Sequence, residues 1–136
     1  MEFLSSRILV RPADFDRSRR FYAEVLGLAV YREFPGGIVF FLGQGLLELS
    51  GSNSGPPSVN VGIWLQVRDL AATARELMAA GADVVRAPRR EPWGLVEMWI
   101  TDPDGLPIVV VEVPADHPLR TDVRGTDEDA SQRDSG

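Results

Sequence analysis

Hydrophobic and polar residues alternate along several short segments of this chain, with the period of two that is typical of half-buried β-strands. Most of these segments end at glycine, proline or a small polar residue, which favours turns between them. The pattern predicts strands over residues 7–11, 28–34, 38–42, 46–50, 61–67, 82–87, 95–101 and 107–113.

Two further segments have the spacing of a helix. Each begins after an aspartate that can cap it, Asp14 or Asp69, and each ends at a glycine, Gly27 or Gly81. The apolar or small residues of the helical faces are Phe15, Ser18, Tyr22, Val25 and Leu26 in the first segment, and Leu70, Ala74, Leu77 and Met78 in the second.

The order of one strand, one helix and three strands therefore occurs twice, with the two capping aspartates 55 positions apart. We predict a first βαβββ module over residues 1–50, a Gly/Ser/Pro-rich linker over 51–58, a second module over 59–114, and a polar, disordered tail over 115–136. The expected fold class is α+β. The two modules form a paired, mostly antiparallel sheet with a concave cup, and the helices lie on its convex side.

One hairpin shows how the strands divide between core and cup. Val96, Met98 and Ile100 alternate with Glu97, Trp99 and Thr101, so one face is apolar and the other presents a carboxylate beside an indole. The turn that follows, Asp102 to Gly105, has a strong turn sequence. We expect Arg7, Leu9, Arg11, Glu48, Trp64, Gln66, Glu97, Trp99 and Val109 on the cup face, and Ile8, Val10, Ile63, Leu65, Val67, Val96, Met98 and Ile100 toward the helices.

Composition removes several kinds of chemistry. The 136 residues include no cysteine, a single histidine (His117) and no lysine, since all 14 cationic residues are arginine. Disulfides, thiolate metal sites, a Ser-His-Asp triad in the core, lysine Schiff bases and a P-loop are therefore excluded. The net charge of −6 argues against a nucleic-acid partner. Neither a signal peptide nor a membrane span is recognisable, so we expect a cytoplasmic protein without a membrane partner.

Several motifs together resemble the vicinal oxygen chelate superfamily, which includes glyoxalase I, extradiol dioxygenases, fosfomycin-resistance enzymes and bleomycin-resistance binding proteins. They are the segment from Asp14 to Tyr22, Val25-Leu26-Gly27-Leu28, Pro92-Trp93-Gly94 and Asp102-Pro103-Asp104-Gly105. The resemblance covers roughly residues 6–113. It implies the fold predicted above, and it implies a homodimer that closes the cup and sometimes exchanges halves.

The metal-dependent members of that family use four ligands, which fall here on Arg7, Glu48, Gly62 and Val109. Only Glu48 is a residue type that binds a divalent cation, and such sites need three or more protein ligands. The resemblance therefore implies no metal or other cofactor and no catalytic residue of the metal-dependent kind. Lyase, dioxygenase and fosfomycin-type transferase activities are disfavoured, and the bleomycin-resistance type is the nearest match.

We therefore predict a metal-free protein that sequesters a small molecule, an aromatic or cationic antibiotic-like ligand, in a cup at a dimer interface. Aromatic stacking, apolar burial and charge pairing would hold it. Two alternatives stay open. One is a metal-independent isomerase or cyclase with Glu48 or Glu97 as acid or base, and the other is a scaffold with an empty cup. The tryptophans would then be core or interface residues, and Arg7 and Glu48 a structural ion pair. The predicted ligand-binding residues are Trp93, Trp99, Trp64, Glu97, Glu48, Arg7 and Phe40.

Overall fold

The computed structural model describes residues 1–56 and 60–117 of the chain. Its first half contains β1 (Ile8–Val10), α1 (Phe15–Arg20), the π-helix η1 (Phe21–Val25), β2 (Val30–Phe34), β3 (Gly37–Leu42) and β4 (Gly45–Ser50). Its second half contains β5 (Ile63–Val67), α2 (Leu70–Ala79), β6 (Asp83–Arg90), β7 (Val96–Thr101) and β8 (Pro107–Glu112). Most of the predicted tail, residues 118–136, and linker residues 57–58 lie outside the described residues.

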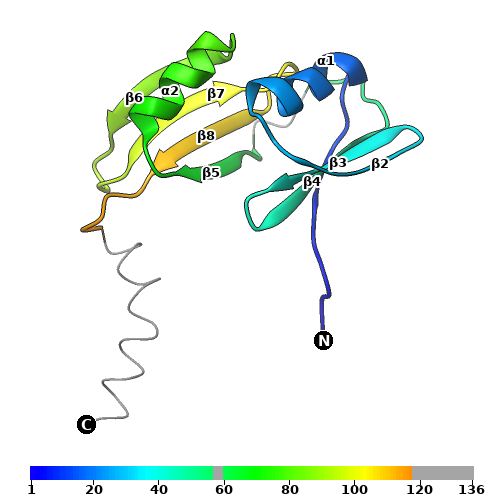
Figure 1. Cartoon of the computed structure of the whole chain (residues 1–136), viewed down its shortest axis with the longest axis horizontal. Coiled ribbons are helices and arrows are strands. Elements are labelled where there is room, and N and C mark those ends of the chain that lie inside the picture. The colour runs from blue at the N-terminus through cyan, green and yellow to red at the C-terminus, as the bar shows by residue number, and fades with distance from the viewer. Residues whose placement is uncertain (57–59, 118–136) are drawn as a thin grey trace.

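Each half forms its own four-stranded sheet, in the order β1-β4-β3-β2 and β5-β8-β7-β6. The pairs β1/β4 and β5/β8 are parallel, and all other pairs are antiparallel. Figure 1 shows α1 and α2 on the same side of the two sheets. The predicted α+β fold of two repeated modules is confirmed. The paired sheet consists of two four-stranded sheets, because β1 and β5 are edge strands and are not hydrogen-bonded to one another.

Both predicted helix starts are confirmed in atomic detail. Asp14 Oδ1 accepts the backbone N–H of Arg17 at 3.1 Å, and Asp69 Oδ1 accepts that of Ala72 at 3.0 Å. The first helix differs from the expected regular α-helix, because its second half is a π-turn in which Leu26 N bonds Phe21 O at 2.9 Å. No described helix is long and apolar enough to cross a membrane.

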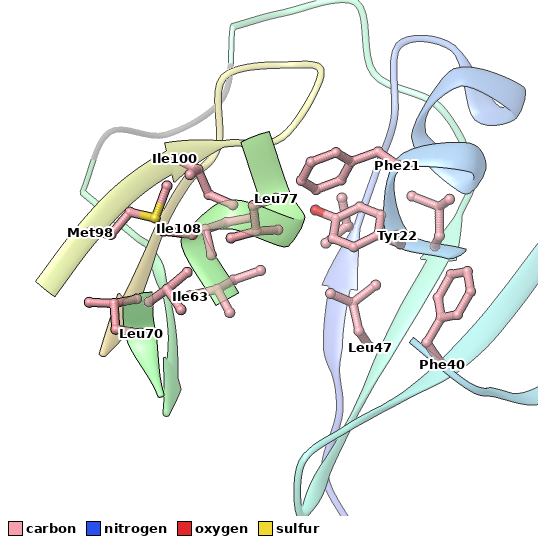
Figure 2. Close-up of a cluster of buried hydrophobic side chains, with 14 of the residues drawn as sticks. Phe21, Tyr22, Phe40, Leu47, Ile63, Leu70, Leu77, Met98, Ile100 and Ile108 are labelled. Carbon is pink, nitrogen blue, oxygen red and sulfur yellow. The ribbon is translucent and has the colours of Figure 1, made fainter. Parts of the chain in front are cut away.

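The main core lies between the helices and the two sheets and includes side chains from both halves. Figure 2 shows Phe21, Tyr22, Phe40 and Leu47 on one side and Ile63, Leu77, Ile100 and Ile108 on the other. Phe40 was predicted to bind ligand, and this is wrong. Its side chain is fully buried on the helix side, with its ring centroid 6.2 Å from that of Tyr22. It shares this face of β3 with Ile38, two residues earlier.

The Asp102–Gly105 turn joins the two halves through hydrogen bonds. Tyr22 donates its hydroxyl to Asp102 Oδ2 at 2.8 Å, inside the core. Asp104 accepts the backbone N–H of Ala13 at 3.1 Å on Oδ2 and Arg17 Nη2 at 2.8 Å on Oδ1. A motif that the sequence presented only as a turn therefore also fixes how the second half sits against α1.

Candidate functional site

The cup face is the face of each sheet turned away from α1 and α2. In the first half it carries a continuous chain of polar contacts across β1 and β4. Arg7 Nη1 donates to Glu48 Oε1 at 3.0 Å, and Ser50 Oγ donates to Glu48 Oε2 at 2.7 Å. Arg11 Nη1 then donates to Ser50 Oγ at 2.8 Å. The ion pair considered from the sequence is thus present, and Arg11 and Ser50 extend it.

These contacts keep Glu48 ionised. The hydrogen bond from Ser50 lowers the pKa of the Glu48 carboxyl most, and the hydrogen bond from Arg7 lowers it further. Both oxygens of the carboxylate are occupied. Glu48 is therefore an oriented anion with its charge balanced by Arg7, and it is a weak base.

The cup face of the second half is aromatic and aliphatic. Trp64, Val109 and Trp99 lie in one row, because Trp64 pairs with Val109 and Trp99 pairs with Val109 across the sheet. Trp99 packs beside a second apolar cluster made by Leu95, Val109, Val111 and Val113. Trp64 is 48% exposed, so its indole offers open surface at the edge of the sheet.

The β6–β7 loop brings a third indole to this face. Trp93 is 57% exposed, as expected for a loop tryptophan, and its Nε1 donates to Glu97 Oε2 at 2.6 Å. Glu97 is only 6% exposed. The carboxylate that was expected to meet a cationic ligand is therefore covered by the protein's own indole, which argues against a direct charge pair with a ligand.

Several residues that the sequence did not single out hold this loop in place. Glu91 is buried and forms ion pairs with Arg86 and with Arg89, whose Nε lies 3.2 Å from Glu91 Oε1. His117 Nε2 lies 2.8 Å from the carbonyl oxygen of Trp93, to which it donates. The only sequence signal for this cluster was two arginines shortly before an acid and a proline, and that pattern is also common on solvated surfaces.

A cavity of about 270 Å³ lies between the edges of β1 and β5. Its apolar lining includes Ile8, Leu9, Val61 and Ile63, and Arg11 borders it beside the polar chain described above. This volume is slightly below the range of about 300–1,000 Å³ that encloses most drug-sized ligands. The cavity alone would therefore hold only part of such a molecule.

The strand register places the four carried-over metal positions at equivalent points of the two halves. Glu48 pairs with Leu9 on β1, as Val109 pairs with Trp64 on β5. Arg7 and Gly62 each precede the first residue of the edge strand. No group of three or more metal-binding side chains exists among residues 1–56 and 60–117. The residues at these positions do not fit a divalent cation, because one is a paired carboxylate and the others have no ligating group.

The structure thus separates the predicted site residues into groups. Arg7 and Glu48 meet on the first sheet, and Trp93 and Glu97 meet on the second, where Trp64 and Trp99 share one row. Phe40 belongs to the core and not to the cup.

Comparison with known proteins agrees with this architecture. Residues 5–110 match the family model described as Glyoxalase/Bleomycin resistance protein/Dioxygenase superfamily. A Synechocystis protein named "Probable lactoylglutathione lyase" is 30% identical over 120 residues, which cover 76% of this chain and 91% of that protein.

Solved structures show the same fold at lower identity. A glyoxalase-related enzyme from Fulvimarina pelagi has a TM-score of 0.69 at 22% identity, covering 85% of this chain and 91% of that one. A lactoylglutathione lyase from Agrobacterium tumefaciens has a TM-score of 0.61 at 23% identity, covering 78% and 90%. Together with the repeated module and its register, these matches show that the chain belongs to the glyoxalase/bleomycin resistance protein/dioxygenase superfamily.

Proposed function

We propose that this chain binds a small aromatic molecule on its cup face without a metal ion, and that it sequesters an antibiotic-like compound in the manner of the bleomycin-resistance branch of its family. The observation that carries the proposal is the ion pair of Arg7 and Glu48 at two of the four metal positions. A divalent cation beside Glu48 would be repelled by the guanidinium and would have to displace it. The lyase activity in the names of the relatives is therefore not carried over to this chain.

The second half supports an aromatic ligand. Trp64 and Trp93 are about half exposed, and Trp99 forms a partly buried floor beside Val109. Flat, exposed indoles on a sheet and on the anchored loop beside it can stack on a planar molecule at little entropic cost. The cup of a single chain is open, so we propose that the ligand is closed in at a homodimer interface.

A cationic ligand is less well supported than an aromatic one, because Glu48 and Glu97 are both engaged by the protein's own donors. The same contacts weaken the alternative of a metal-independent isomerase or cyclase. Glu48 has a lowered pKa and is a poor proton acceptor. Glu97 would have to release the Trp93 indole before it could reach a substrate. A scaffold with an empty cup is the third reading, and the binding experiment below separates it from the first.

A thermal-shift screen with aromatic antibiotics and aromatic metabolites tests the proposal, because a ligand of the native state raises the melting temperature. For any compound that does so, Trp93→Ala and Trp64→Ala should each weaken binding by about 1–3 kcal/mol, roughly ten- to a hundredfold. Met78→Ala is the matched control, since it removes exposed apolar surface from α2, away from the cup.

Trp99→Ala should lower stability as well as affinity, because its ring packs beside buried residues of the second cluster. Stability and affinity should therefore be measured on the same variants. The proposal fails if the compounds that stabilise the parent protein bind Trp93→Ala and Trp64→Ala as tightly as the parent. It also fails if no compound of either class binds, which would favour the empty scaffold.

A further inference from the structure

The guanidinium of Arg7 has unused hydrogen-bonding capacity on the cup face. A guanidinium carries five N–H donors in a planar fork. Among the residues that the structure describes, Arg7 uses only Nη1, toward Glu48 Oε1. Its side chain is 34% exposed, so part of it remains accessible to a ligand. The contact with Glu48 orients the guanidinium and leaves other N–H donors unpaired within the described residues.

The surroundings of this fork are positively charged. Glu48 is the only carboxylate in the polar chain, and its two oxygens are taken by Arg7 and Ser50, while Ser50 is held by Arg11. Arg32 lies in the same row of the sheet, since it pairs with Val39 and Val39 pairs with Glu48. The cup face of the first half thus presents three arginines against one carboxylate, which favours an anion there. Asp102 and Asp104 line the adjoining cavity.

We propose that Arg7 anchors the carboxylate of a small aromatic acid, at the place where metal-dependent relatives hold their ion. This inference rests on the proposed function and names the chemical class of its ligand. A guanidinium fork and a carboxylate match in plane and spacing, so two parallel N–H···O contacts can form. Arg11 has a positioning role, because it acts on Glu48 through Ser50.

The apolar body of the acid has space next to this anchor. Leu9 pairs with Glu48 and lines the cavity between β1 and β5, and Gly62 borders the same cavity from the opposite strand. A Cβ at Gly62 would lie 3.2 Å from Pro107 O, so a side chain at this position would be crowded against the backbone. Beyond it, Trp64 provides an exposed indole on the same face. One end of the ligand would thus be held by charge and the other by apolar contact.

Three matched probes test this inference by calorimetry: 2-naphthoate, 2-naphthamide and 2-naphthylmethylammonium. They share one ring system and carry an anionic, a neutral and a cationic substituent, respectively. We expect the parent protein to bind naphthoate on the order of tenfold more tightly than naphthamide, with the ammonium weakest. Raising NaCl to about 0.5 M should reduce this preference, because the site is partly exposed.

Arg7→Gln should abolish the preference for naphthoate and leave the affinity for naphthamide unchanged. Arg7→Lys keeps the charge beside Glu48 but removes the fork, so it should lose most of the preference while remaining folded. Arg75→Gln is the control, since it removes the same charge from an exposed position on α2.

The outcomes separate this inference from the proposed function. Equal binding of naphthoate and naphthamide by the parent would overturn the role of Arg7 and leave an aromatic cup intact. If the ammonium probe bound most tightly, the role of Arg7 would be overturned, because carboxylates on the cup face would then be binding the ligand. If both Arg7→Gln and Arg7→Lys still preferred naphthoate, the carboxylate of the ligand would bind elsewhere, and the role of Arg7 would again be overturned. No binding of any probe would count against both proposals.

Discussion

The hydrogen bond between Tyr22 and Asp102 joins the two halves of the chain, and its contribution to stability can be isolated. Tyr22→Phe removes one oxygen atom and leaves every carbon of a fully buried ring in place. Asp102 is 2% exposed, so its Oδ2 loses a hydrogen-bond partner inside the core once the hydroxyl is gone. A buried acceptor that loses its partner costs about 1–3 kcal/mol. For a chain of this size we take about 4 °C per kcal/mol, so the melting temperature should fall by roughly 4–12 °C.

Urea unfolding followed by tryptophan fluorescence measures this loss, with the free energy taken from linear extrapolation. Tyr31→Phe is the control and should change stability by less than about 0.5 kcal/mol, because Tyr31 is half exposed. Asp102→Ala should cost more than Tyr22→Phe, since the carboxylate also accepts the N–H groups of Asp104 and Leu106. Burial raises the pKa of Tyr22, and the charge of Asp102 raises it further, so the hydroxyl remains a donor at alkaline pH. If Tyr22→Phe is as stable as the parent within about 0.5 kcal/mol, the reasoning is refuted.

Three further predictions follow from the site and the assembly. The parent protein should have a larger free energy of unfolding than Glu48→Gln at pH values above the ordinary glutamate pKa of 4.5. This difference should shrink as pH falls below 4.5, because the pKa of Glu48 is lowered in the folded state. A pH-independent difference in urea unfolding would contradict this. Elemental analysis after dialysis should find far less than one equivalent of zinc, nickel, iron or manganese, and a chelator should leave the melting temperature unchanged. Sedimentation should show a homodimer at tens of micromolar, and a monomer would remove the two-protomer site.

Much of the fold could be predicted from the sequence, because its signals are local. Asp14 and Asp69 cap helices through contacts three residues away, and both helices end near glycines with positive φ. Strand alternation placed Val96, Met98 and Ile100 toward the helices and Trp99 toward the cup, as observed. These features depend on hydrophobic periods of two or 3.6 residues and on residues close together in the sequence, so the sequence alone is enough to predict them.

The site was less predictable, because it depends on which distant side chains meet. Nothing local shows that Ser50 links Arg11 to Glu48, or that Trp93 reaches back to Glu97. Phe40 was misplaced because the face of a strand residue follows from strand register, which a single strand does not reveal. In the structure Phe40 pairs with Leu47, a core residue, so it turns toward the helices.

The two halves share one topology, but the residues at the equivalent metal positions are polar in the first half and apolar in the second. Where the first half has a guanidinium and a carboxylate, the second has Gly62 and Val109, and Leu9 in the first half corresponds to Trp64 in the second. A molecule lying across both halves would meet a polar end and an aromatic end. The topology is repeated, yet the surface is directional. An asymmetric molecule with a polar end and an aromatic end would therefore bind in one orientation, and a symmetric one would leave half of the contacts unmatched.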